Sequence, residues 1–249
     1  MSSSSSKITV GIIGFGAFGR LLANHLSPHV SLRIRDTARA VARLESGAEY
    51  PCASLEEIAG CEYIVLAVPV SEIGRVSRDL APLLGAGTTV VDVGSVKVAP
   101  TEAMRAELPA HVGIVGTHPL FGPQSARTGL TGLKIAICPV RGTGHRHIAA
   151  FLKSVFRLRT IITTAEAHDR EAATVQGLTH LIAKVMVEME PLPTKLTTVS
   201  YDLLIEAINM VKDDAPNVFD AIERANPFSI GVRDEFFTKA AEIRNRFEA

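Results

Sequence analysis

The sequence contains no tryptophan, and aromatic residues make up only 5% of its 249 residues. This scarcity argues against a surface for single-stranded nucleic acid, because such surfaces stack bases on aromatic side chains. The charges produce no net field either, since 26 Lys and Arg balance 26 Asp and Glu. We therefore expect neither nucleic acid nor an anionic membrane surface as a partner.

Cysteines and long apolar runs are also scarce. The three cysteines, Cys52, Cys61 and Cys138, have neither CxxC spacing nor the spacing of metal ligands, which predicts reduced thiols and no metal site. Charges or glycines interrupt every apolar stretch before it reaches the length of a membrane span. Residues 1–6, Met followed by serines, lack the apolar core of a secretion signal. We expect a cytoplasmic protein with a disordered tail over 1–6.

From Lys7 to about Thr164, short β-branched runs alternate with helical patterns. This alternation is typical of βαβ units and a parallel sheet. The expected strands are Ile8–Ile13, Ser31–Arg35, Tyr63–Ala67, Thr88–Asp92, Gly113–Gly116, Lys134–Cys138 and Arg159–Thr163. The expected helices are Phe18–Leu26, Ala38–Glu45, Ser71–Leu84, Ala99–Leu108 and His145–Val155, with a short capped helix beginning at Ser54.

After about Ala165 the strand signals stop, and apolar residues recur at helical spacing. The expected helices here are Ala167–Met189, Leu196–Val211, Asn217–Arg224 and Val232–Phe247. The sequence therefore predicts an α/β fold with two domains. A Rossmann-type domain with a mostly parallel sheet covers residues 7–164, and an all-helical C-terminal domain covers 165–249.

A glycine motif, Gly14-Phe15-Gly16-Ala17-Phe18-Gly19, stands between an expected strand and an expected helix. This is the context in which GxGxxG binds a dinucleotide, with the pyrophosphate on the helix amides; a glycine-rich turn without a ligand is the alternative. Asp36, after the second expected strand, favours NAD, because a carboxylate there binds the ribose 2′-hydroxyl and repels a 2′-phosphate. Arg35 and Arg39 leave NADP open. The expected cofactor contacts are Gly14, Phe15, Gly16, Ala17, Phe18, Gly19, Asp36 and Val68.

Two further polar loops follow expected strands, and the second of them contains His118. Because open α/β sheets bind ligands at the carboxyl ends of their strands, these loops and the glycine loop predict a single site. Three blocks resemble the prephenate/arogenate dehydrogenase family of tyrosine biosynthesis. The first block is Val91–Lys97 and the second is Gly116–Pro123. The third block is His168-Asp169-Arg170 followed by Gln176, Thr179 and His180, and it is similar to the start of that family's helical dimerisation domain.

The resemblance implies an enzyme that oxidatively decarboxylates prephenate to 4-hydroxyphenylpyruvate, with hydride transfer to NAD(P). This chemistry needs a group that accepts the carbinol proton, and a neutral histidine suits that role. His118 matches the family's catalytic histidine. Ser95 matches the serine that hydrogen-bonds the substrate hydroxyl, and Lys97 is expected to support its loop. The structural alternatives are a turn-capping histidine and a serine that only forms a turn.

The resemblance also implies which residues contact the substrate. Prephenate carries two carboxylates, so we expect cations in the site. The family commonly supplies an arginine from the helical domain; here Lys195 resembles the lysine at the corresponding helix start, and Arg127 is a second candidate. Gln176 and His180 are the other expected contacts, with a core role as the alternative for His180. Gln124 occupies a position where relatives often have an acidic residue, which favours prephenate over arogenate.

Other interpretations remain open. The chain is alternatively an arogenate dehydrogenase that gives tyrosine directly, or another Rossmann-type dehydrogenase, such as a hydroxy-acid enzyme using Lys184 as its acid/base. A third possibility is an NAD-binding sensor without turnover. The resemblance further implies a homodimer formed through the helical domain. Six apolar residues offer side chains for that interface, unless they fill the core of the domain itself: Val211, Val218, Phe219, Phe228, Phe236 and Phe237.

Overall fold

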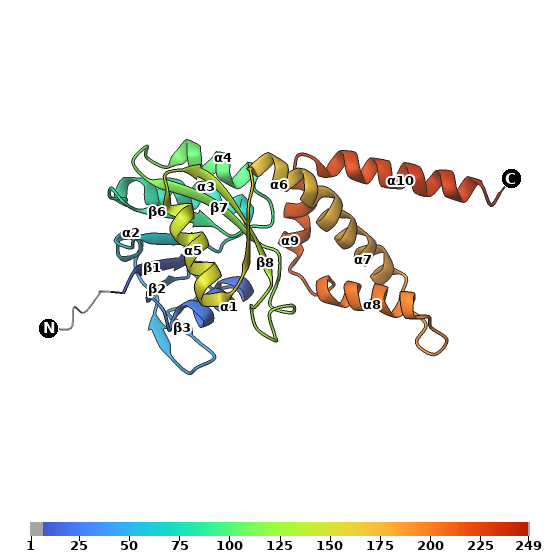
Figure 1. Cartoon of the computed structure of the whole chain (residues 1–249), viewed down its shortest axis with the longest axis horizontal. Helices are drawn as coiled ribbons and strands as arrows, with labels where there is room; N and C mark the ends of the chain where they lie inside the picture. The colour runs from blue at the N-terminus through green and yellow to red at the C-terminus, as the bar shows by residue number, and fades with distance from the viewer. Residues whose placement is uncertain (1–6, 249) are drawn as a thin grey trace. The chain divides into compact units, whose positions relative to one another are not determined.

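The computed structural model describes residues 7–248, so the predicted tail over 1–6 lies outside the described part. The chain divides into two compact units, the first ending at Ala165 and the second beginning at Glu166 (Figure 1). None of the helices within 7–248 is both long and apolar enough to cross a membrane.

The first unit is built on a seven-stranded sheet with the order β2-β1-β5-β6-β7-β8-β9. All neighbouring strands are parallel except β7 and β8, which are antiparallel. The mostly parallel sheet of the prediction is therefore confirmed. The strands are β1 (Thr9–Ile13), β2 (Ser31–Arg35), β5 (Tyr63–Leu66), β6 (Thr89–Asp92), β7 (Gly113–Pro119), β8 (Lys134–Arg141) and β9 (Arg159–Ile162).

Helices cover both faces of this sheet because successive buried side chains of a strand point to opposite faces. Ile13 and Leu66 pack with side chains of α2, α3 and α4 on one face. Ile12 packs with α1, and Ile137 with α5, on the other; Figure 1 shows α5 in front of the sheet. The helices are α1 (Ala17–Leu26), α2 (Leu55–Ala59), α3 (Ile73–Leu80), α4 (Val98–Glu107) and α5 (Gly144–Phe156), with short 3-10 turns η1 (Val70–Glu72) and η2 (Ala81–Leu83) flanking α3.

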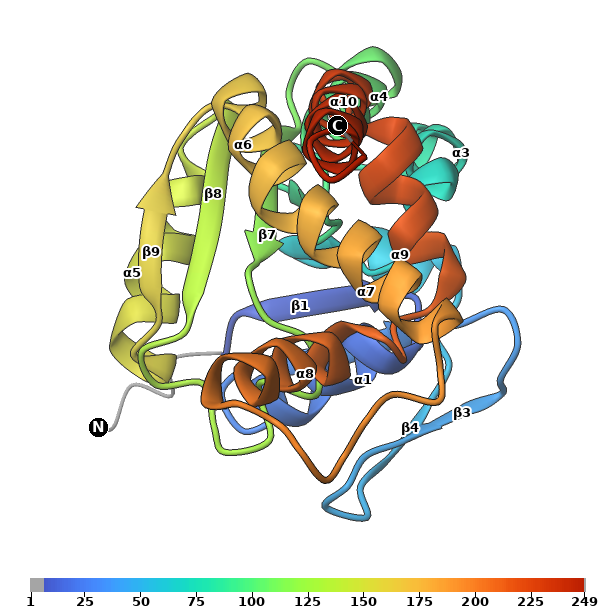
Figure 2. The ribbon, with the colours of Figure 1, turned by 90° about the vertical axis from the view of Figure 1, so that its right-hand side faces the viewer.

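The helix predicted over Ala38–Glu45 is wrong. The segment instead forms a two-stranded hairpin of β3 (Val41–Arg43) and β4 (Glu49–Pro51) (Figure 2). Burial alternates along it, with Ala42 and Leu44 buried between exposed neighbours. Period-two burial is the pattern of a strand that lies on a core, and Gly47, with φ of +83°, provides the turn that reverses the chain.

The second unit is helical throughout its described residues. The helix predicted over Ala167–Met189 is interrupted by a π-helical segment, which widens the helix locally. Helices α7 and α8 pack against each other (Figure 2). The elements are α6 (Ala165–Ala172), the π-helix η3 (Ala173–Gly177), α7 (Leu178–Glu188), α8 (Val199–Val211), α9 (Pro216–Asp220), a second π-helix η4 (Ala221–Ala225) and α10 (Ser229–Asn245).

Candidate active site

Three parallel strands of the first unit, β1, β5 and β6, end on one row of paired residues, and that row continues to Gly116 on β7. The register pairs Ile13 with Leu66, Leu66 with Asp92, and Asp92 with Gly116. Because the carboxyl ends of parallel strands share one edge, the segments that continue from these four residues lie along that edge. Those segments carry the glycine loop, Val68, Ser95 and His118. The sheet therefore gathers these sequence-predicted residues of the first unit on one side.

The glycine loop has room for a ligand at its second glycine only. A Cβ on Gly14 would lie 2.4 Å from the Ala67 carbonyl oxygen, and φ there is +99°; a Cβ on Gly19 would lie 2.1 Å from the Gly14 carbonyl oxygen. A Cβ on Gly16, in contrast, would meet no atom within 4 Å. Helix α1 begins directly after Gly16, and no side chain caps its first amides. Open space in front of uncapped helix amides fits the pyrophosphate of a dinucleotide.

Asp36 is held against this loop. Its carboxylate accepts hydrogen bonds from the Phe15 amide at 2.8 Å and the Ala38 amide at 2.9 Å, and it pairs with Arg39 at 3.2 Å. Burial by itself raises the pKa of the Asp36 carboxyl, but these hydrogen bonds and the Arg39 charge outweigh it, so the pKa lies below its ordinary value. Asp36 is thus a carboxylate at neutral pH, fixed beside the glycine loop where a ribose would lie.

Asp92 and Lys97 form a fully buried ion pair beneath the edge of the sheet. Both side chains are 0% exposed, and the Lys97 ammonium donates to Asp92 Oδ1 and, at 2.7 Å, to the Thr117 carbonyl oxygen. Thr117 Oγ1 donates back to the Asp92 carbonyl oxygen at 2.7 Å. Asp92 Oδ1 also accepts from the Gly94 amide at 2.9 Å. The pair therefore joins the segment that carries Ser95 to the residue immediately before His118.

His118 lies on a strand and not in the loop predicted for it. Strand β7 continues through Pro119 because β8 runs antiparallel beside it, with His118 opposite Ala136. The prediction of a mostly parallel sheet did not say which strands are antiparallel, so it did not include the backbone hydrogen bonds between β7 and β8. The His118 side chain is 6% exposed, so its position is set by the sheet.

The other predicted residues of the first unit lie close by in the chain. Ser95 and Gln124 are half-buried, and Arg127 is exposed in the turn that follows β7. The Arg127 amide donates to the Gln124 carbonyl oxygen at 3.4 Å, and the Gly122 amide to Ser125 Oγ at 3.1 Å. The polar side chains of Gln124 and Arg127 thus come from one compact turn.

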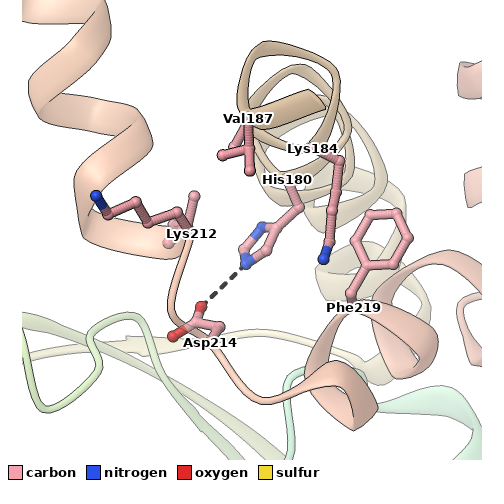
Figure 3. A pocket seen from close by; sticks show the side chains of 8 residues that line it. His180, Lys184, Val187, Lys212, Asp214 and Phe219 are labelled. Carbon is pink, nitrogen blue, oxygen red and sulfur yellow. Dashed lines mark hydrogen bonds and ion pairs between the residues drawn. The ribbon is translucent and has the colours of Figure 1, made fainter. Parts of the chain in front are cut away.

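In the second unit, two of the three predicted residues come together. His180 on α7 is 6% exposed; its Nδ1 lies 3.0 Å from the carbonyl oxygen of Gln176 on η3, and its Nε2 lies 3.1 Å from Asp214 Oδ2 (Figure 3). The Gln176 side-chain Oε1 is buried and has no hydrogen-bond partner within 7–248. Lys195 is exposed in the segment between α7 and α8 and does not line the pocket around His180.

Asp92 and Asp214 are the residues that the sequence reasoning missed. Asp92 ends a strand whose other residues are all apolar or small, and all of them are buried. A carboxylate in such a strand requires a buried partner, and Lys97 lies five residues further along the chain. This signal was available in the sequence. Asp214 carries no comparable signal, because its partner His180 is distant in the chain.

Together, the fold and the carboxyl-edge geometry define a Rossmann-type nucleotide-binding protein. Residues 18–160, more than half of the chain, match the family model of the prephenate dehydrogenase nucleotide-binding domain. The chain belongs to this family.

Individual relatives are similar over nearly the whole of this chain. A protein named "Probable arogenate/prephenate dehydrogenase" from Methanocaldococcus jannaschii is 24% identical over 96% of this chain and 56% of its own length. Arogenate dehydrogenase 1 of Arabidopsis thaliana is 26% identical over 97% of this chain and 39% of its own length. The chain thus spans about half the length of these relatives.

The fold is similar to a crystal structure of prephenate dehydrogenase from Aquifex aeolicus, solved with hydroxyphenyl propionate and NAD+. The TM-score is 0.73 at 18% sequence identity, and the match covers 98% of this chain and 91% of the other. Because the sequence identity is only 18%, this structural similarity establishes that the two proteins share a fold and nothing more.

Proposed function

We propose that the protein oxidatively decarboxylates prephenate to 4-hydroxyphenylpyruvate, with hydride transfer to NAD(P). The observation that carries this proposal is the edge of the sheet. The open glycine loop follows Ile13 there, and His118 lies on β7 two residues beyond Gly116, which belongs to the same row of paired residues as Ile13. Family membership supports the same chemistry. The resemblance of the Ser95 and His118 segments assigns the roles.

In this reaction, His118 accepts the proton of the carbinol hydroxyl as hydride leaves the same carbon. The C–C bond to the ring carboxylate then breaks, its electron pair enters the ring, and CO2 departs as the ring becomes aromatic. When bound, the nicotinamide supplies the hydride acceptor. Ser95 hydrogen-bonds the substrate hydroxyl and orients it toward the imidazole. The Asp92–Lys97 pair holds both segments in place through Thr117.

The residues around the glycine loop favour NAD as the cofactor. The Asp36 carboxylate binds a ribose 2′-hydroxyl and repels a 2′-phosphate. Arg39 is paired with Asp36, so its charge is partly neutralised in this arrangement. NADP remains the alternative, because a rearranged Arg39 or Arg35 side chain provides a cation for the extra phosphate.

Activity with different substrates tests this proposal directly. We expect the purified chain to reduce NAD with prephenate or arogenate, and to leave simple hydroxy acids unreacted. The measurement is NAD(P)H absorbance with each substrate and each cofactor. Turnover of hydroxy acids alone would establish the alternative of a hydroxy-acid dehydrogenase. NAD binding without turnover of any of these substrates would establish a sensor.

Gln124 provides a prediction about substrate choice. Arogenate has an amino group where prephenate has a keto oxygen, and a buried ammonium needs a charged partner. Replacing the half-buried Gln124 with Glu should therefore raise kcat/KM for arogenate relative to prephenate by about tenfold, the effect of one charge-assisted hydrogen bond. Parallel kinetics with the two substrates measure this ratio, and Gln124→Asn is the neutral control. An unchanged ratio in Gln124→Glu would remove Gln124 from substrate selection.

We also propose that the protein acts in the cytoplasm as a homodimer formed through its helical unit. The resemblance to the family supports the dimer, and apolar side chains exposed on α10 provide contact area, among them Ile230 and Phe237, which are 59% and 49% exposed. Sedimentation equilibrium of the purified chain measures the oligomeric state.

A further inference from the structure

The first unit contains a cavity between α1, α5 and the sheet face that these two helices cover. Its volume is about 180 Å³. Helix α1 packs on β1 and β2, and α5 packs on β7, β8 and β9, so the central strands β5 and β6 lie below the gap between the helices. Val65 and Val91 are the side chains that these strands present to the cavity. Valine is too short to fill the space between two helices that stand apart, and the cavity is the result.

The lining of this cavity is almost entirely apolar. Among residues 7–248, no Asp, Glu, Lys or Arg lines it. The Thr117 hydroxyl does line it, but it already donates to the Asp92 carbonyl oxygen at 2.7 Å. Such a cavity does not hold water well, because a buried water needs two to four polar partners. A charged ligand would lose its hydration without gaining an ion pair. The lining therefore selects an uncharged, apolar molecule.

One side of the cavity is a cluster of aromatic rings. Phe156 makes edge-to-face contacts with Phe151, His29 and His25, at centroid distances of 5.5, 5.6 and 6.0 Å, and all four rings line the cavity. Aromatic rings favour a further ring as a neighbour, in the same edge-to-face or offset geometry. His29 and Ile8 are exposed members of the lining, so a ligand has a route into the cavity.

The size of the cavity limits the ligand to a single ring. An engineered apolar cavity of about 150 Å³ in another protein stays dry and binds benzene. We propose that the cavity between α1 and α5 binds a small uncharged aromatic molecule, one ring with at most a short apolar substituent.

This cavity is separate from the candidate active site. Thr117 and Pro119 line it, and His118 does not, because successive side chains of a strand point to opposite faces of the sheet. The glycine loop over 14–19 and Ser95 are also absent from its lining. The cofactor and the substrate of the proposed function therefore leave the cavity unfilled, and the ligand is an additional one.

Toluene and benzoate test the choice of ligand, because each has one ring and only benzoate carries a charge. Toluene at ten times its dissociation constant should raise Tm of the whole chain by about 4 °C through mass action, and benzoate at the same concentration should not. NMR cross-peaks should join the toluene protons to the methyl groups of Val65 and Ile148, which line the cavity. The proposal is wrong if toluene leaves Tm unchanged, if benzoate raises it equally, or if the cross-peaks involve only methyl groups outside the cavity.

Filling the cavity by substitution provides the matched control. Ile148→Phe, on α5, places a ring in the volume that the ligand needs, and the dissociation constant for toluene should rise at least tenfold. Val65→Leu fills the cavity more gently from the sheet side, and the thermal transition of each variant shows whether it is folded. Val155→Phe adds the same ring to α5 at an exposed position outside the cavity and should bind toluene normally. Unchanged toluene binding in the folded filling variants would overturn the proposal.

Competition with NAD distinguishes this cavity from the cofactor site. Saturating NAD should leave the dissociation constant for toluene within about twofold, because the glycine loop does not line the cavity. Displacement of toluene by NAD would assign the ligand to the cofactor site and contradict the proposal. None of these measurements requires turnover, so a failure of the proposed function leaves the cavity assignment standing, and a failure to bind toluene leaves the proposed function standing.

Discussion

Replacing His118 with asparagine should lower kcat about 1,000-fold and leave the affinity for NAD within about twofold of its original value. A positioned general base contributes about 10²- to 10⁴-fold to a reaction rate, and the asparagine amide cannot accept the carbinol proton. The substitution retains a polar side chain of similar reach on β7, where the backbone pairing with β8 fixes the position. Steady-state NADH formation gives kcat, and calorimetric titration gives the NAD dissociation constant.

The pH profile provides the control for this variant. In the original chain, kcat should fall at acidic pH as the His118 imidazole becomes protonated, and this acidic limb should be absent from the residual activity of His118→Asn. Ser95→Ala should reduce kcat by only about tenfold and keep the acidic limb, because it removes one hydrogen bond and not the base. More than a tenth of the original kcat in His118→Asn would contradict the assigned role.

Replacing Lys97 with methionine should destabilise the first unit and remove most activity. Methionine is similar in length but leaves the Asp92 carboxylate buried without its cation, which costs about 3–5 kcal/mol. For a chain of this size that cost lowers Tm by roughly 10 °C. The variant also removes the donor to the Thr117 carbonyl oxygen, so the backbone before His118 loses its tie to the Ser95 segment. Differential scanning calorimetry and kcat measure the two effects.

A double variant separates stability from positioning. In Asp92→Asn/Lys97→Met no charge is buried, and the asparagine oxygen still accepts from the Gly94 amide, so most of the lost stability should return. Activity should remain low, because the donor to Thr117 is still missing. Lys153→Met, at an exposed position on α5, is the control for loss of a lysine charge. An unchanged Tm and kcat in Lys97→Met would contradict the positioning role of the pair.

The sequence predicted the sheet well because its strands are short apolar runs with clear boundaries. The expected strand Ser31–Arg35 matches β2 at both ends, and the expected strand Tyr63–Ala67 differs from β5 by one residue. The glycine motif was predictable for the same reason, since its position between a strand and a helix can be read locally. The helix predicted over Ala38–Glu45 failed because a short alternating segment is ambiguous without its hairpin partner, and that partner lies beyond Gly47.

The parts of the site that the sequence did not reveal depend on contacts between distant residues. The strand that carries His118 is longer than expected because β8 pairs with it, and that antiparallel partner follows a turn that interrupts the pattern. The bond from Lys97 to the Thr117 backbone joins two segments whose relative placement only the folded sheet determines. The resemblance alone did not place Lys195, which is exposed between α7 and α8 and does not line the pocket around His180.

The release of CO2 per hydride transferred tests the proposed reaction most directly. Prephenate labelled with ¹³C at its ring carboxylate would be incubated with the purified chain and NAD at neutral pH, with a parallel sample lacking NAD. The proposed mechanism predicts one labelled CO2 for each NADH formed, and none above background without NAD. NADH formed without labelled CO2, or NAD bound with neither product formed, would contradict it.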